Sequence, residues 1–315
     1  MNPVHSDHFT LQQLAPGVYA ALARSDGWAI ANAGIIDLGR ETLVFDAFIS
    51  PAAGADLRAA AEALFDRPVR FLVNSHYHND HVWGNQAFDA STTIIADAET
   101  RALFDTAGQE EVDYYGSIAA DRLADLQARH AAAADDGERS AITPWITYFA
   151  ALAATMPILN VRRPTLTFLD RLTLHGAARR AELRNFAGGH TPSDTVLLLP
   201  DDGILFAADL LFVETHPYLS HGDPDALLAS TAGLADLPVD RVIPGHGPVG
   251  TPADFGVQRD YVALCRRAAA TLAAAGQTVD DLDRDALPTP FNSWALDRFF
   301  SANVAFFLEQ RHGAS

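Results

Sequence analysis

The feature that most constrains this chain is the stretch FLVNSHYHNDHVWGNQAF at residues 71–88, where an apolar run ends in a group of metal-binding side chains. The apolar start predicts a buried β-strand. Polar side chains at such a place need a partner, because burial without one is unfavourable. Imidazole and carboxylate suit Zn²⁺, with iron and manganese as alternatives, so the cluster predicts a metal site. Its donors are His76, His78, Asp80 and His81.

The spacing of these donors predicts two clusters rather than one. Side chains on a strand return to the same face at every second residue. If the chain stays extended through SHYH, His76 and His78 point the same way. If it then turns, Asp80 and His81 face a second point nearby. The sequence therefore predicts two adjacent groups of ligands.

Further ligands are expected from three later places that share one local form, a strand followed by a donor beside glycine or another small residue. His190 ends FAGGH, Asp209 lies in ILFAADLLF, and His246 lies in VIPGHG. Glycine lets the backbone turn sharply and bring such a donor to a common edge. The three residues are therefore candidate ligands for the same site.

The order of predicted elements indicates one α/β domain over residues 1–315. The first third and the segment after residue 160 alternate short β-rich runs with turns. Residues of about 98–160 are alanine-rich with a helical period, which predicts a helical insertion. Residues of about 252–315 predict a helical C-terminal extension. No repeat at solenoid spacing is visible.

Composition excludes several classes of function. The net charge is −18, which argues against binding to nucleic acid or an anionic membrane. All 22 basic residues are arginine, so a lysine Schiff base is excluded. The single cysteine, Cys265, allows no intramolecular disulfide. No stretch reads as long enough to cross a bilayer, and the N-terminus shows no secretory signal, so we expect a cytoplasmic protein.

Together these motifs resemble the metallo-β-lactamase superfamily over about residues 17–250. The matching pieces are LVFDAF, HYHNDH, GGHTPSD, FAADLLF and PGHG. The resemblance implies a four-layer αββα sandwich with a binuclear metal site at one edge. It implies that Asp209 bridges the ions and that Asp46 supports the histidine loop without being a ligand. The implied ligands are His76, His78 and His190 for the first ion, and Asp80, His81 and His246 for the second.

The resemblance also implies an activity, that of a zinc-dependent metallo-hydrolase with two Zn²⁺ per chain. Hydroxide formed from water between the two ions would attack the carbonyl of a small ester, lactone, thioester or β-lactam-type amide. Asp80 and Asp209 would orient this nucleophile as well as bind metal, which makes them the candidate catalytic residues. The expected partner is a small-molecule substrate.

Branches of the superfamily differ at positions that this sequence shows. Asp209 is similar to the bridging aspartate of glyoxalase II enzymes and homoserine-lactone lactonases, where β-lactamases usually have Cys or Ser. Phe212 stands where the lactonases have tyrosine, although Tyr218 in the next loop could supply a phenol. The lysines with which glyoxalase II enzymes hold glutathione are absent. His78 stands where the flavodiiron oxidoreductases have glutamate. The pattern is most similar to the broad zinc hydrolase branch.

Several alternatives stay open from the sequence. One is a mononuclear iron oxidoreductase of the persulfide dioxygenase type, and another is a scaffold that keeps metal only for stability. A homo-oligomer is a further open alternative. Histidines 216 and 221 could touch substrate, but we expect them to be solvated loop residues. The insertion's aromatic residues either pack its helices onto the body or a second subunit, or cover the metal edge; they are Tyr114, Tyr115, Trp145, Tyr148 and Phe149.

Overall fold

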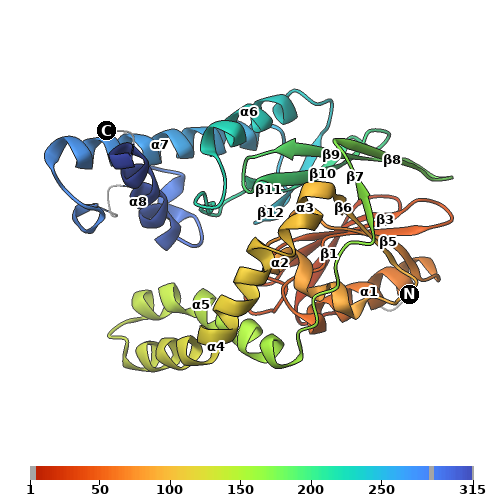
Figure 1. Cartoon of the computed structure of the whole chain (residues 1–315), viewed down its shortest axis with the longest axis horizontal. Coiled ribbons are helices and arrows are strands. Elements are labelled where there is room, and N and C mark those ends of the chain that lie inside the picture. The colour runs from red at the N-terminus through yellow and green to blue at the C-terminus, as the bar shows by residue number, and fades with distance from the viewer. Residues whose placement is uncertain (1–4, 284–286, 314–315) are drawn as a thin grey trace.

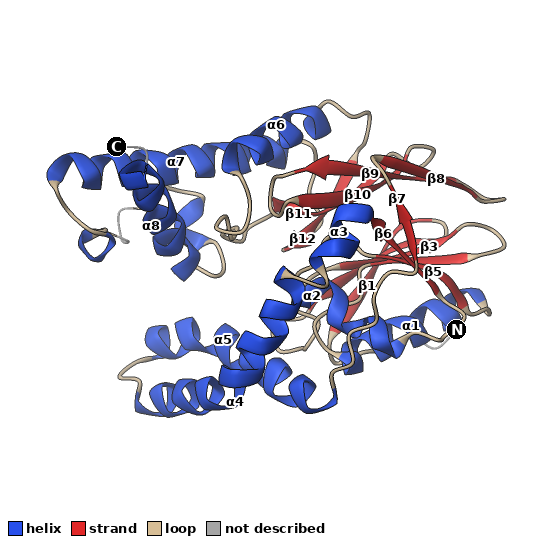
Figure 2. Cartoon of the chain, viewed as in Figure 1, coloured by secondary structure: helices blue, strands red, loops and turns tan. Residues whose placement is uncertain are grey.

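Two β-sheets lie face to face in this protein, and helices cover their outer faces (Figures 1 and 2). The structure is a computed structural model that describes residues 5–283 and 287–313, with only the backbone for 311–313. This arrangement confirms the predicted α/β class and the four-layer αββα sandwich.

The first sheet has seven strands in the order of the chain. Its first four strands are antiparallel and its last four are joined by parallel pairings. The strands are β1 (Phe9–Ala15), β2 (Val18–Ala23), β3 (Ala33–Asp37), β4 (Thr42–Phe45), β5 (Val69–Val73), β6 (Thr93–Asp97) and β7 (Leu166–Phe168).

The second sheet has five strands in the order β12-β11-β10-β9-β8. Strand β11 pairs in parallel with β12, and the other pairings are antiparallel. Every residue of β11 is buried, which explains its continuous apolar sequence, since a central strand is covered on both faces. The strands are β8 (Arg171–His175), β9 (Arg180–Ala187), β10 (Ser193–Leu199), β11 (Ile204–Phe212) and β12 (Arg241–His246).

Three apolar layers hold the sandwich together. The middle layer lies between the sheets and includes Phe45 and Phe206, whose ring centroids are 6.0 Å apart. The outer face of the first sheet packs against α1 (Pro51–Phe65). This helix begins where Ser50 accepts a hydrogen bond from the N–H of Ala53, and Pro51 occupies the first turn, as is usual for helix starts.

The outer face of the second sheet packs against helices of the C-terminal half. Burial of each large apolar side chain there contributes roughly 1.5–3 kcal/mol. Cys265 lies in this layer and is fully buried. The helical elements are α6 (Pro224–Ala235), α7 (Ala253–Ala275), η3 (Val279–Asp281), η4 (Phe291–Ser293) and α8 (Arg298–Gly313).

The segment expected to be a helical insertion is helical in the structure. Its helices pack with Tyr77, Val82 and Trp83 in an apolar cluster of their own. The helices are α3 (Ala98–Leu103), α4 (Ala107–Ala132), α5 (Asp136–Thr155) and η2 (Met156–Ile158). Helices α4 and α5 lie at the same end of the molecule as α7 and α8 (Figure 1).

One part of the insertion corrects an expectation from the sequence. The segment Asp136–Ile158 is long and apolar enough, by length and composition, to cross a membrane, with a mean hydropathy of 1.3. The expectation that no stretch reaches this length was therefore wrong. A core helix of a soluble protein passes the same test, and α5 packs here against α4 in an apolar cluster. That the protein does not bind a membrane stays a prediction.

Candidate metal centre

The histidine loop follows β5 and bends rather than staying extended. A bend runs through residues 75–77, and the short helix α2 (Asn79–Val82) begins directly after His78. Despite the bend, His76 and His78 point to one place, with 3.1 Å between Nε2 of the first ring and Nδ1 of the second. The short helix turns Asp80 and His81 toward a second place. The two predicted clusters therefore form, although the backbone reaches them by a different path.

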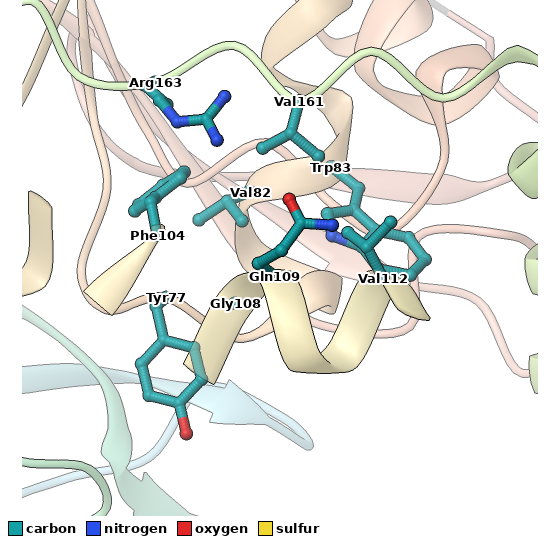
Figure 3. Close-up of a pocket in the computed structure, with 9 residues that line it drawn as sticks. All are labelled: Tyr77, Val82, Trp83, Phe104, Gly108, Gln109, Val112, Val161 and Arg163. Atoms are coloured by element: carbon teal, nitrogen blue, oxygen red, sulfur yellow. The ribbon is translucent and has the colours of Figure 1, made fainter. Parts of the chain in front are cut away.

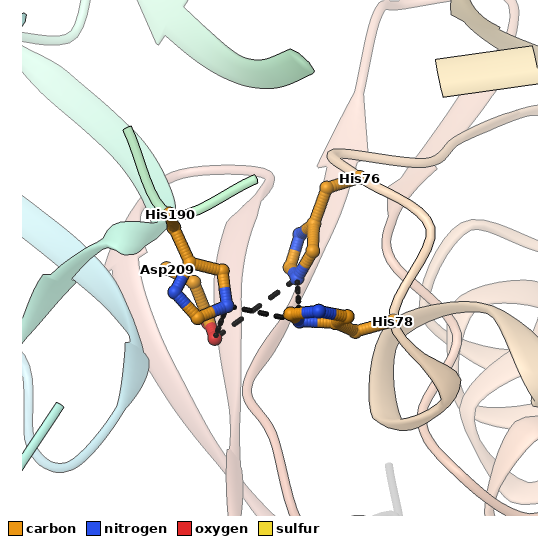
Figure 4. A group of neighbouring side chains, drawn as sticks. All are labelled: His76, His78, His190 and Asp209. Atoms are coloured by element: carbon orange, nitrogen blue, oxygen red, sulfur yellow. Dashed lines mark hydrogen bonds and ion pairs between the residues drawn. The ribbon is translucent and has the colours of Figure 1, made fainter. Parts of the chain in front are cut away.

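The first donor group consists of three imidazoles and one carboxylate (Figure 4). The Nε2 atom of His190 lies 2.9 Å from Nδ1 of His78 and 3.1 Å from Oδ2 of Asp209. Each side chain of the group offers one ligand atom, and these atoms lie within 4.8 Å of one another. The four residues are His76, His78, His190 and Asp209.

The second donor group consists of Asp80, His81 and His246. The Nε2 atom of His246 lies 3.3 Å from Oδ2 of Asp80. Asp209 also faces this group, with Oδ1 at 3.1 Å from His81 Nε2 and Oδ2 at 3.5 Å from His246 Nε2. One carboxylate thus lies between both groups, and all seven candidate ligands converge on one edge of the sandwich.

Local backbone features aim Asp209 at this edge. The pairing of β11 with β12 is irregular around Ala208, whose φ is +45°. Such a bulge redirects the side chain that follows it. Gly245 is needed for a reason other than a turn: a Cβ atom there would lie 1.7 Å from Asp209 Oδ1. Glycine beside His246 therefore lets the carboxylate approach, whereas Gly189 beside His190 does have a positive φ, of +142°.

Asp46 fixes which nitrogen of two histidines is free to bind a metal. Its Oδ2 atom accepts hydrogen bonds from the Ser75 hydroxyl and from His81 Nδ1, each at 2.8 Å. Ser75 Oγ in turn accepts from His76 Nδ1 at 2.8 Å. The Nε2 lone pairs of His76 and His81 are therefore left for the two donor groups. Asp46 itself has a φ of +61°, a strained conformation typical of functional sites.

The donor set fits a metal ion on grounds of hydrogen bonding. Within the described part of the chain, three buried atoms at the site make no hydrogen bond: His81 Nε2, His190 Nδ1 and Asp209 Oδ1. Two of them, His81 Nε2 and Asp209 Oδ1, face each other. Buried polar atoms without partners are unfavourable. A cation between them would satisfy both, and the N and O donors are those that zinc prefers.

The two groups differ in charge. Burial, with help from neighbouring histidines, lowers the pKa of His76 and His78 well below its usual value. Burial alone would also lower the pKa of His246. The carboxylates of Asp209 and Asp80 outweigh this effect of burial and raise the pKa of His246 to about 9. His76 and His78 are therefore neutral and ready to bind a metal, whereas a metal that binds His246 in the second group displaces a proton.

Comparison with known proteins identifies the family. The family model described as the metallo-beta-lactamase superfamily matches residues 26–246, well over half of the chain. The chain belongs to the metallo-β-lactamase superfamily. Asp46 and all seven candidate ligands lie within the match, whereas the helical C-terminal extension, which begins with α7, lies outside it.

Two solved structures of the superfamily share the fold of this chain. A metallo-β-lactamase from Pontibacter korlensis has a TM-score of 0.57 at 15% identity, covering 80% of this chain and 97% of its own. The FIM-1 metallo-β-lactamase from Pseudomonas aeruginosa, in its mono-zinc form, has a TM-score of 0.56 at 14% identity, covering 80% and 94%. At these identities the likeness concerns the fold alone.

A curated relative comes from sequence comparison. The linear primary-alkylsulfatase of Pseudomonas sp. (strain ATCC 19151) is 25% identical over 190 residues, which are 58% of this chain and 35% of that protein. The chain thus spans about a third of the length of this relative. Membership of the superfamily supports a hydrolase with a metal-binding His/Asp site.

The helical insertion contacts the histidine loop directly. Glu111 of α4 accepts a hydrogen bond from the backbone N–H of Asn79 at 3.0 Å. The side chain of Asn79 also lies 3.3 Å from the Tyr148 hydroxyl of α5. Tyr115 packs edge-on against Trp83, just after the loop. The insertion therefore lies against the residues that surround Asp80, and its aromatic side chains also pack its own helices together.

A small hollow lies between the histidine loop and the insertion (Figure 3). Its space for water-sized molecules is about 10 Å³, enough for about one water. This hollow is too small to hold a substrate and is a packing defect between the insertion and the body. Its lining residues are Tyr77, Val82, Trp83, Phe104, Gly108, Gln109, Val112, Val161 and Arg163.

Of the two histidines expected in solvated loops, His216 contradicts the expectation, whereas His221 is exposed in a loop but has a partner at the site. His216 is fully buried, and its Nδ1 lies 3.0 Å from the Tyr261 hydroxyl, so it belongs to the core rather than to a solvated loop. His221 is exposed, yet its Nδ1 lies 2.9 Å from Nε2 of His78. Sequence reasoning missed this contact, and that of Glu111, because no local pattern links such distant residues.

Proposed function

We propose that this protein is a hydrolase that uses two metal ions, zinc in the first instance, to cleave a small ester, lactone, thioester or β-lactam-type amide. The observation that supports the proposal most is the position of Asp209, whose two oxygens face both donor groups. A single carboxylate in that position suits a pair of ions better than one ion.

The proposed roles follow from the geometry. Metal ions bound at this edge would polarise a carbonyl oxygen and lower the pKa of a water molecule. Residues of the first group would hold one ion and those of the second group the other, with Asp209 shared. Asp80 and His246 are the most exposed donors, at 15% and 12% of their side chains. Substrate would therefore approach from their side.

The chain's own residues would contribute orientation and exclusion of water. The side chain of Asp80 is partly exposed, so its carboxylate could accept a hydrogen bond from the attacking water and orient it. The remaining ligands are buried, and Asp46 holds two of their rings in the tautomer that leaves Nε2 free. Prior orientation of this kind lowers the cost of reaching the transition state.

The substrate class is chosen on the carbonyl chemistry of the superfamily branches that Asp209 resembles. Two names among the similar proteins define further substrates to test. The relative named as an alkylsulfatase supports a sulfate ester in the panel, and the structural neighbours named as metallo-β-lactamases support a β-lactam. A cytoplasmic location and a small-molecule substrate also stay part of the proposal.

The experiment begins with metal content. Purified protein is stripped with a chelator, reloaded separately with zinc, iron or manganese, and assayed by mass spectrometry for ions per chain. Each sample is then tested on a chromogenic ester, a thioester, a lactone, a β-lactam and a sulfate ester. We expect two ions per chain and turnover of at least one carbonyl substrate that the chelator abolishes.

Two results would reject the proposal. A fully loaded protein that cleaves none of the carbonyl substrates would point to a scaffold or, if the sulfate ester is cleaved, to a sulfatase. One iron per chain, with oxygen uptake on a persulfide, would favour the mononuclear oxidoreductase. That alternative would leave the converged second group of Asp80, His81 and His246 without an ion.

A further inference from the structure

The outer nitrogen of one metal-site histidine has a partner from a distant loop. His78 turns Nδ1 toward His76 and His190, at 3.1 and 2.9 Å. Its opposite nitrogen, Nε2, lies 2.9 Å from Nδ1 of His221, which is 143 residues further along the chain. Both nitrogens of the ring are thus occupied, one by the donor group and one by a side chain outside it.

The position of one proton gives this contact its meaning. A neutral imidazole carries a proton on one nitrogen only. If Nδ1 of His78 is to bind a metal, the proton of the ring must be on Nε2. His221 Nδ1 must then accept the hydrogen bond from that N–H. We propose that His221 is a positioning residue that holds His78 as the Nε2–H tautomer and aims its Nδ1 at the first metal ion. The inference rests on the metal centre of the proposed function.

Partners of this kind are a general need of metal-binding histidines, which usually donate their second N–H to a fixed acceptor. His76 and His81 receive this support from Asp46, through Ser75 in one case and directly in the other. Asp46 makes no such contact with His78 among its hydrogen bonds. His221 therefore fills for His78 the role that Asp46 fills for the other two.

His221 is exposed, so its position depends on its neighbours. Tyr218 packs edge-on against the His221 ring, with centroids 4.9 Å apart, and also against Phe299 at 5.4 Å. Phe299 of α8 packs in turn on Trp145 of α5, again at 5.4 Å. The loop that carries His221 is thus held where the C-terminal extension meets the insertion, which gives both added segments a link to a metal ligand.

A different reading of the same residues would be a third cation site. Glu111, His221 and His78 have ligand atoms within 4.8 Å of one another. A cation there would take Nε2 of His78 while the first metal takes Nδ1, so the ring would have to lose both protons. A hydrogen bond requires no such loss. The number of ions bound per chain separates the two readings.

The experiment compares two substitutions of His221 in the full chain. His221→Asn keeps an oxygen acceptor near the place of Nδ1, whereas His221→Leu removes it. His175→Leu, at an exposed histidine on β8, is the matched control. Zinc affinity is measured by competition with a chromophoric chelator, and the cobalt-loaded proteins are compared by their visible absorption. Circular dichroism and thermal melting verify that each variant is folded.

We expect His221→Leu to weaken the tighter zinc-binding step about 10–100-fold and to change the cobalt spectrum, because His78 loses its acceptor. His221→Asn and His175→Leu should retain most of the affinity and the native spectrum. Equal affinity in all variants, or an equal loss in the Leu and Asn variants, would overturn the proposal. Three zinc ions in the parent protein and two in both His221 variants would favour the cation site instead. None of these readouts depends on turnover, so a failed hydrolase assay would leave the result interpretable.

Discussion

Two clusters of buried histidine in this molecule use the same residue type in opposite ways. At the metal edge, Nε2 of His76 and Nε2 of His190 lie 3.1 and 2.9 Å from Nδ1 of His78. On the far face of the second sheet, His216 lies in what we name the core histidine cluster, formed by His216, Tyr261, Trp294 and Asn303.

The core histidine cluster matches donors with acceptors. The Tyr261 hydroxyl lies 3.0 Å from His216 Nδ1 and 3.1 Å from Nδ2 of Asn303. Asn303 also donates to the carbonyl of Pro217 at 2.7 Å and accepts from the N–H of Leu219 at 3.1 Å. A network of complementary partners stabilises a fold by itself. Lone pairs that face one another do not, and they indicate a site that needs a cation.

Asp209→Asn should have the largest effect, a loss of metal and activity at the metal edge that leaves the core histidine cluster unchanged. This substitution keeps the shape of the side chain and removes the charge that faces both donor groups. A metal clamp contributes several kcal/mol to the transition state, so we expect kcat/KM to fall at least about a thousand-fold, with loss of one or both ions. Metal analysis and turnover of the best substrate provide the measurement. If the variant kept two ions and an activity within tenfold of the parent protein, the metal edge would not differ from the core histidine cluster in its need for a cation.

A smaller effect on the metal edge is expected from Asp46→Asn. The amide places its N–H₂ group either against the Ser75 backbone N–H or against both the Ser75 hydroxyl and His81 Nδ1, where carboxylate oxygens now accept. Metal affinity should fall about 10–100-fold. Asp170→Asn is the matched control, because Asp170 is exposed and has a similar φ of +58°. If both variants bind zinc equally well, Asp46 does not orient the ligands.

The metal edge could be predicted from the sequence because each ligand carries a local signal. His76 to His81 follow a buried strand within a few residues. His190 follows β9 and His246 ends β12, each beside glycine, whereas Asp209 lies within β11 where its pairing with β12 is irregular. Strand ends meet at one edge of a sandwich, so local patterns were sufficient. The role of Gly245 was not predictable, since it depends on how close Asp209 comes from a neighbouring strand.

Glu111 and His221 could not be predicted either, because their roles, like that of Gly245, depend on residues that are distant in the sequence. Glu111 lies on an exposed, polar helix, and His221 lies in a loop with no periodic pattern. Their contacts with Asn79 and His78 exist only once the insertion and the loop have packed. His216 was misjudged because its sequence neighbours are polar, whereas Tyr261 and Trp294 cover it in the folded chain.

In the core histidine cluster, Tyr261→Phe should affect stability and leave the metal edge intact. The change deprives His216 Nδ1 and Asn303 Nδ2 of a buried partner, which costs about 1–3 kcal/mol of the free energy of unfolding. Urea denaturation of the metal-free protein measures this loss, and chelator competition should find zinc affinity unchanged. A drop in zinc affinity as large as that of Asp46→Asn would show that the two clusters are not independent.

Modification of the Cys265 thiol by a thiol reagent should have no effect on the metal edge. Burial raises the pKa of the Cys265 thiol to about 12 from an ordinary value near 9. The thiolate is the reactive form, so below pH 9 a shift of this size lowers its population about a thousand-fold. Modification by a thiol reagent at pH 8 should therefore be slow in the native protein, become faster as the pH rises, and be rapid in denaturant. The Tyr261 hydroxyl lowers the thiol pKa slightly by a hydrogen bond. Tyr261→Phe should nevertheless accelerate modification, because the less stable protein exposes the thiol more often, whereas Asp46→Asn should not accelerate it. Acceleration by Asp46→Asn instead would mean that disturbance of the metal edge loosens the helical layer across the second sheet.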